Sequence, residues 1–188
     1  MESLLAYLES YGPLPDADKD FIAEHLTLRD YPKHGIVLQA GNVCRQMYYL
    51  ESGLVRYCYL KEGKDITASF AGANMSMTVL DSLVNRSPSP YTIEALEPTR
   101  LYSLAYDDLT PLFARSHAFE HISRLATLDI FLMGERWMYT QRFQSAHERY
   151  ESFLTMYASF AHRVPLTHVA SYLGITLETL SRIRAGRI

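Results

Sequence analysis

The stretch VPLTHVASYLGITLETLSRIRAGRI, residues 164–188, decides how the C-terminal part of this chain folds. Ala170 is followed four residues later by Gly174, and Leu180 follows six residues after the glycine. In a helix-turn-helix the small residue lets two helices cross closely, the glycine takes a left-handed turn, and the later apolar residue anchors the second helix. Thr176 stands where its hydroxyl can cap that second helix. The spacing therefore predicts a helix-turn-helix. Its small core is expected to contain Val169, Leu173, Ile175 and Ile183.

Charge is distributed unevenly along the chain. Residues 162–188 contain four arginines and a single acid, Glu178, which gives a formal charge of +3, while the rest of the chain carries −6. A basic segment on an acidic body is what local attraction to nucleic-acid phosphates requires. An ordinary helical hairpin with glycine in its turn is the alternative interpretation. The segregated charge favours a DNA-binding motif.

The N-terminal half of the second helix is the part that a helix-turn-helix points into the major groove. There Arg182 could pair with guanine and Glu178 could accept from cytosine N4, each contact contributing about 1–3 kcal/mol of discrimination. Thr179 and Ser181 suit a phosphate or a thymine methyl group, whereas two further arginines suit the DNA backbone or a plain solvated face. The predicted DNA-binding residues are Thr167, Thr176, Glu178, Thr179, Ser181, Arg182, Arg184 and Arg187.

Residues 116–142, which precede this module, contain neither glycine nor proline apart from Gly134 and are expected to form one long helix. Its apolar residues fall on two stripes, and a helix that is apolar on two sides usually packs on its own domain and on something else. A helix buried in a single core is the alternative. The two stripes favour a dimerisation helix. Its predicted contact residues are Ile122, Leu125, Ala126 and Met133.

From Gly35 to about Leu104 the sequence consists of short runs rich in Val, Ile, Tyr and Thr, separated by glycines and prolines. This pattern is typical of a small antiparallel barrel or sandwich. The expected strands are residues 47–50, 54–60, 66–70, 91–96 and 100–104. Before them, residues 4–8 and 16–26 are expected to be helical, with Asp16 or Asp18 as a cap and the second helix ended by Tyr31-Pro32.

These segments predict an α+β protein with three parts: an N-terminal β-barrel domain, residues 1–115; a dimerisation helix, residues 116–142; and a DNA-binding helix-turn-helix domain, residues 143–188. The chain is 48% hydrophobic and 21% charged, which is ordinary for a globular protein. Its N-terminus is acidic where a signal peptide is basic, and no run of about 18 apolar residues occurs. A cytoplasmic location without membrane association is therefore expected.

Other chemistries find little support in the sequence. Cys44 and Cys58 are too few for a four-thiolate cluster and are expected to be reduced core residues. A cupin-like metal centre needs two or three histidines, and the barrel region offers only His34. The sequence contains no phosphate-binding loop, nucleophile elbow or recognisable carboxylate pair. We expect neither a metal site nor catalysis, while haem bound through a single histidine is left open.

The chain resembles the Crp/Fnr family of bacterial regulators. The resemblance is carried by GITLETLSRI, residues 174–183, and by a barrel framework of Gly41, Tyr48-Tyr49-Leu50, Gly53, Val55 and Gly72. It implies a cyclic-nucleotide-binding-type jelly roll, a dimerising helix and a helix-turn-helix, with Glu178 and Arg182 as base-reading residues. Leu177 stands where many relatives have arginine, so the preferred half-site should differ.

The stretch that resembles the family's phosphate cassette departs from its pattern. Ser76-Met77 replace the Gly-Glu pair that binds ribose, and Ser89 falls near the position of the arginine that binds phosphate. Methionine cannot accept a hydrogen bond from a ribose hydroxyl, and a neutral serine leaves the phosphate charge uncompensated. We expect no tight binding of cyclic AMP and no cofactor, although another small effector could occupy the barrel. The residues assigned to the effector pocket are Ser76, Met77, Arg86, Ser89 and Tyr91.

Together these features predict a homodimeric, sequence-specific transcription regulator that binds a pseudo-palindromic site in double-stranded DNA. The two recognition helices of such a dimer lie about 34 Å apart, one turn of DNA. RNA polymerase is a further conceivable partner. The alternative is a ligand-binding or protein-interaction module that does not read DNA, and salt-dependent DNA affinity would distinguish the two.

Overall fold

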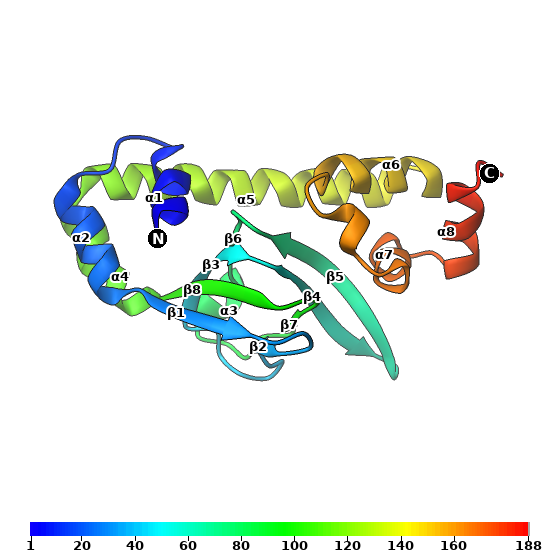
Figure 1. Cartoon of the computed structure of the whole chain (residues 1–188), viewed down its shortest axis with the longest axis horizontal. Helices are drawn as coiled ribbons and strands as arrows, with labels where there is room; N and C mark the ends of the chain where they lie inside the picture. Colours follow the sequence, from blue (N-terminus) through cyan, green and yellow to red (C-terminus); the bar gives the residue numbers. More distant parts are fainter. Residues whose placement is uncertain (188) are drawn as a thin grey trace.

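The computed structural model describes residues 1–187, which form an antiparallel barrel, a long helix along it and a C-terminal group of helices (Figure 1). The strands are β1 (Thr27–Tyr31), β2 (Ile36–Leu38), β3 (Gln46–Ser52), β4 (Leu54–Lys61), β5 (Lys64–Gly72), β6 (Ser76–Met77), β7 (Thr92–Ala95) and β8 (Thr99–Ala105). The helices are α1 (Glu2–Glu9), α2 (Asp16–His25), α3 (Leu80–Asn85), α4 (Tyr106–Arg115), α5 (His117–Phe143), α6 (Ala146–Met156), α7 (Leu166–Leu173) and α8 (Leu177–Arg184).

The barrel consists of two four-stranded sheets with the orders β1-β8-β3-β6 and β2-β7-β4-β5, and every pairing is antiparallel. Their inner faces meet in a core that includes Leu50, Val55, Ile93 and Leu101, each fully buried. All five predicted strands are present, and the expected α+β fold with a jelly-roll barrel is confirmed. Both cysteines are free and buried, as expected.

The sequence analysis missed three strands and placed one helix end wrongly. The helix α2 ends at His25, not at Tyr31-Pro32, because Thr27–Tyr31 pairs with β8 as strand β1. This strand is largely exposed and contains Arg29 and Asp30, so it lacks the apolar alternation that marks a half-buried strand. Neither Asp16 nor Asp18 caps α2; the N-cap is Pro15. Asp18 is instead buried and accepts a hydrogen bond from Ser116.

Helix α5 runs along the length of the molecule, with α1, α2 and α4 near one end and α6 to α8 near the other (Figure 1). Its N-cap is Ser116, whose hydroxyl accepts a hydrogen bond from the Phe119 amide at 3.1 Å. Ile122, predicted to be a dimer contact, is completely buried among α1, α2 and α4. That prediction is wrong, because a side chain with no exposed surface in its own protomer cannot contact a partner.

The predicted helix-turn-helix is present at the C-terminal end. Gly174 adopts the left-handed conformation at φ 68° after α7, and Thr176 caps α8 by accepting from the Thr179 amide at 3.1 Å. Ala170 and Leu180 are both buried, as the motif requires. Upstream, Ser145 and Glu148 form a capping box that starts α6.

The C-terminal helices share a hydrophobic core with the barrel. Phe70 of β5 makes edge-on or tilted ring contacts with Phe153, Tyr157 and Tyr172. The ring of Phe160 lies directly over Gly72, where no side chain would fit. The helix-turn-helix is thus packed against the outer edge of the barrel, since β5 is the edge strand of its sheet. Among the described residues, no helix combines the length and the apolar character needed to cross a membrane.

Candidate nucleic-acid interface and effector cavity

The second helix of the helix-turn-helix, α8, presents its polar residues to solvent. Glu178, Ser181 and Arg182 are exposed, while Leu180 and Ile183 on the opposite face are buried. Thr179 is half-buried, and its hydroxyl lies 3.0 Å from that of Thr176, so both threonines take part in the helix cap. The local sequence produces this arrangement because apolar residues three apart face the core and the positions between them do not.

Three arginines at this end of the molecule have free guanidinium groups. Arg182, Arg184 and Arg187 are exposed, and none forms an ion pair with a side chain of residues 1–187. The fourth arginine of the basic segment, Arg163, pairs instead with Glu97 beside the barrel. Within the basic segment, residues 162–188, the positive charge available for phosphate contacts therefore lies on and just after α8. Thr167, at the start of α7, is also exposed.

A cavity with a volume of about 1160 Å³ lies between the barrel, α5 and the helix-turn-helix. Its lining combines apolar and aromatic groups from strands β4, β5 and β7 with Trp137 of α5 and Tyr172 of α7. The barrel, α5 and the helix-turn-helix therefore all contribute to the walls of this cavity. Mostly apolar walls with a few polar groups are typical of small-molecule sites.

The structure separates the five residues predicted for the effector pocket. Ser76, Met77 and Tyr91 line the cavity, but Arg86 and Ser89 do not. Arg86 follows α3 in a left-handed conformation, and its guanidinium pairs with Asp107. The side chain of Ser89 is buried, and its hydroxyl donates to the backbone carbonyl of Tyr91, two residues along the chain, at 2.8 Å. The assignments of Arg86 and Ser89 to the pocket are therefore corrected.

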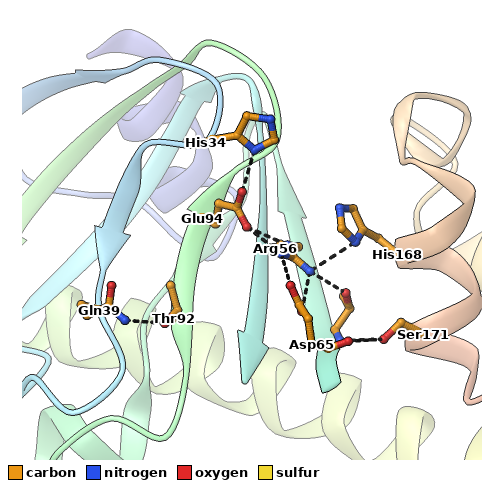
Figure 2. A network of polar contacts seen from close by, with 9 residues as sticks. His34, Gln39, Arg56, Asp65, Thr92, Glu94, His168 and Ser171 are labelled. Atoms are coloured by element: carbon orange, nitrogen blue, oxygen red, sulfur yellow. Dashed lines mark hydrogen bonds and ion pairs between the residues drawn. The ribbon is translucent and has the colours of Figure 1, made fainter. Parts of the chain in front are cut away.

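The one basic side chain in the cavity lining, as far as residues 1–187 are described, is Arg56 of β4, and it is already neutralised (Figure 2). Arg56 is 5% exposed and donates to both carboxylate oxygens of Asp65 at 2.8 and 2.7 Å. Its Nε and Nη2 donate to one oxygen of Glu94 at 3.0 and 2.7 Å. Burial opposes ionisation of Glu94, but hydrogen bonds from His34 and Arg56 hold the pKa of this carboxyl below its ordinary value.

Sequence reasoning did not find this cluster. One signal was available: Arg56 is the third residue of LVRYCYLK, among buried residues of β4, and a buried charge requires partners. The identity of those partners follows from the sheet pairing, because Glu94 lies opposite Arg56 across β4 and β7. His168, which also contacts Arg56, comes from α7, 112 residues away in the sequence.

The face of α5 that turns away from the barrel is rich in exposed apolar side chains. Phe131 is 60% exposed and Tyr139 59% exposed. Of the predicted dimer residues, Leu125, Ala126 and Met133 are each partly exposed, while Met133 also lines the cavity. Large apolar surfaces on a soluble chain usually mark an interaction site. The exposed apolar residues of α5 outside the cavity lining are Leu128, Phe131, Leu132, Met138, Tyr139 and Phe143, whereas the exposed Ile130 and Trp137 line the cavity.

Residues 28–116 match the family model of the cyclic nucleotide-binding domain, which here spans the barrel, α3 and α4. This part of the chain is thus similar in sequence to cyclic nucleotide-binding domains. Among curated protein sequences, none matches the chain significantly.

Solved structures place the whole chain in the Crp/Fnr fold. FixK2 from Bradyrhizobium japonicum has 19% sequence identity and a TM-score of 0.70, with 86% of this chain and 83% of that chain covered. The catabolite activator protein of Thermus thermophilus has 19% identity and a TM-score of 0.59, with 96% and 85% covered. The regulator CLP of Xanthomonas campestris, described as responsive to c-di-GMP, has 15% identity and a TM-score of 0.65, with 92% and 91% covered. The resemblance to Crp/Fnr regulators drawn from the sequence is confirmed.

Proposed function

We propose that the chain is a sequence-specific DNA-binding transcription regulator and not an enzyme. The observation that carries the proposal is the helix-turn-helix whose exposed helix α8 bears Glu178 and Arg182, beside arginines that have no carboxylate partner among the described side chains. Its neighbours in fold, FixK2 and the catabolite activator protein, support the proposal. Arg182 and Glu178 would contact base edges, and Arg184 and Arg187 would contact phosphates.

The test is selection of random duplex DNA by the purified chain, followed by a salt titration on the enriched sequence. We expect a pseudo-palindrome, an affinity that falls steeply with salt, and a loss of about 1–3 kcal/mol for Arg182→Ala. Arg45→Ala is the matched control, because it removes the same charge from an exposed site beside the start of α4, at the end of the molecule opposite α8 (Figure 1). Equal effects of the two substitutions would favour the alternative, a module that binds a ligand or a protein and does not read DNA.

We also propose that the regulator is a homodimer formed through α5. The exposed apolar face of this helix, centred on Phe131 and Leu132, supports the proposal, because a second copy of the same face would cover it symmetrically. Phe131→Glu should convert the dimer to a monomer in sedimentation experiments and weaken binding to a two-half-site duplex. Leu60→Glu is the control, since Leu60 is 78% exposed on the β4–β5 hairpin. Unchanged mass of the Phe131 variant would reject the α5 interface.

The effector pocket is proposed to be altered, so that cyclic AMP binds weakly or not at all. A cyclic phosphate needs an unneutralised cation, and Arg56 is held by two carboxylates. The aromatic lining, which includes Tyr57, Tyr91 and Trp137, instead suits an uncharged planar molecule. Calorimetry with cyclic AMP should show no binding at micromolar concentration, and a micromolar affinity would overturn this part of the proposal.

A further inference from the structure

Helix α7, the first helix of the helix-turn-helix, is joined to the barrel by polar contacts as well as by the shared core. Nη1 of Arg56 lies 3.2 Å from Nδ1 of His168, and the Thr67 amide donates to the Ser171 hydroxyl at 2.9 Å. Figure 2 shows His168 and Ser171 on α7 facing Arg56 and Asp65 on the neighbouring strands. We refer to these two hydrogen bonds as the α7–barrel contact.

The chemistry of the two groups fixes the protonation state of His168. A guanidinium has only N–H donors and keeps its proton at all ordinary pH values. The Nδ1 atom of His168 must therefore accept, which requires a neutral ring whose proton is on Nε2. Protonation of His168 would place a hydrogen on Nδ1 and a second positive charge next to the guanidinium, so the hydrogen bond would be replaced by repulsion.

Four charged or titratable groups face His168 from the elements packed against α7: Arg56 of β4, Asp65 of β5, Glu94 of β7, and His34 in the β1–β2 turn. Helix α7 itself, LTHVASYL, has one other titratable residue, Tyr172, and burial raises the pKa of its phenol, so Tyr172 stays neutral where histidine titrates. Burial lowers the pKa of His168 most, and the positive groups Arg56 and His34 lower it further. Asp65 and Glu94 act in the opposite direction, but their oxygens already accept from Arg56. The net direction is a lowered pKa, which favours the neutral ring that the geometry requires.

We propose that the α7–barrel contact is a proton-sensitive regulatory device: neutral His168 strengthens the packing of the helix-turn-helix on the barrel, and protonation of His168 weakens that packing. The proposal rests on the proposed function, because α8, the helix that would enter the DNA groove, is joined to α7 through the turn at Gly174. The contact is present when His168 is neutral. It weakens once the pH falls below about 6.5, where a histidine in the released state takes up its proton.

The amide of Thr67 reports directly on this contact, because β5 is an edge strand and the partner of this amide is Ser171. We would measure its hydrogen-exchange protection by NMR between about pH 7.5 and pH 5.5, the range in which histidine titrates. Wild-type protection should decrease several-fold toward pH 5.5. His168→Gln should keep constant protection, because the glutamine oxygen can accept from Arg56 and does not titrate in this range.

His34→Gln is the matched control, because it removes the other histidine of the cluster, whose ring contacts Glu94 and not α7. This variant should retain the pH dependence of the wild type. Constant wild-type protection, an equal decrease in His168→Gln, or loss of the pH dependence in His34→Gln would each overturn the proposal. If His168→Gln does not fold, the protonation state of the His168 ring in the wild type is measured by NMR instead. A proton on Nδ1 at neutral pH would contradict the hydrogen bond from Arg56. The hydrogen-exchange measurements are made without DNA, so they test the α7–barrel contact even if the chain does not bind DNA.

Discussion

Two arginines of this chain illustrate how burial determines what a charge can do. Arg182 on α8 is exposed and has no carboxylate partner among the described side chains, whereas Arg56 in β4 is 5% exposed and is held by Asp65 and Glu94. A buried charge must be paired to be tolerated, and the pairing consumes its capacity to bind an external anion. The barrel therefore contributes a neutralised cluster, while the helix-turn-helix end presents the free positive charge.

The largest expected effect on stability comes from removing the buried arginine, Arg56. Arg56→Ala leaves Glu94 and Asp65 without their cation, and loss of one partner of a buried ion pair costs about 3–5 kcal/mol. We expect the lower end, about 3 kcal/mol, because Asp65 is half exposed. Urea unfolding measures the free energy. Arg182→Ala should change it by less than about 0.5 kcal/mol; similar losses for both variants would contradict the distinction.

A smaller effect, on DNA affinity, should distinguish an arginine that contacts phosphate from one that contacts a base. Arg187 is exposed just after α8 and is expected to contact phosphate, so Arg187→Ala should weaken binding to all sequences by a similar factor. It should also reduce the slope of log affinity against log salt by about 1. Arg182→Ala should instead change which base is preferred at one position. Loss of sequence preference in the Arg187 variant would mean that Arg187, and not Arg182, contacts a base.

The smallest expected effect is the pH dependence of the stability that Glu94 contributes. The pKa of Glu94 is below its ordinary value because, against the effect of burial, His34 and Arg56 hydrogen-bond its ionised form. Its contribution to stability is therefore complete above the unfolded pKa of about 4.3 and is lost as the pH falls through the lower folded value. Glu94→Gln should be less stable than the wild type at neutral pH, and this difference should shrink on acidification. A difference that is constant from neutral to acid pH would show that Glu94 is not ionised in the cluster.

Much of the fold could be predicted from local patterns in the sequence. The helix-turn-helix follows from Ala170, Gly174 and Leu180, since its turn and its crossing need those residue types at that spacing. The long helix was predicted within a residue of its observed bounds, because an almost uninterrupted stretch without glycine or proline is a local property. Strand β1 could not be predicted, because its stability comes from pairing with β8, about 70 residues later.

The candidate sites depended more strongly on tertiary structure. The sequence identified the polar face of α8 because helical periodicity alone separates Arg182 from Leu180 and Ile183. It could not tell which apolar face of α5 is internal, so Ile122 was assigned to the wrong interface. It also placed Arg86 and Ser89 in a pocket from which loop geometry excludes them.

By itself, then, the sequence determined most of the helices and strands, the helix-turn-helix and the basic character of the C-terminal segment, because these depend on residues close together in the chain. Only the tertiary structure decided that Arg56, Asp65, Glu94 and His168 meet. Three of these residues are brought together by strand pairing, and the fourth arrives when α7 packs on the edge strand β5. Such contacts join positions far apart in the chain, and no local periodicity encodes them.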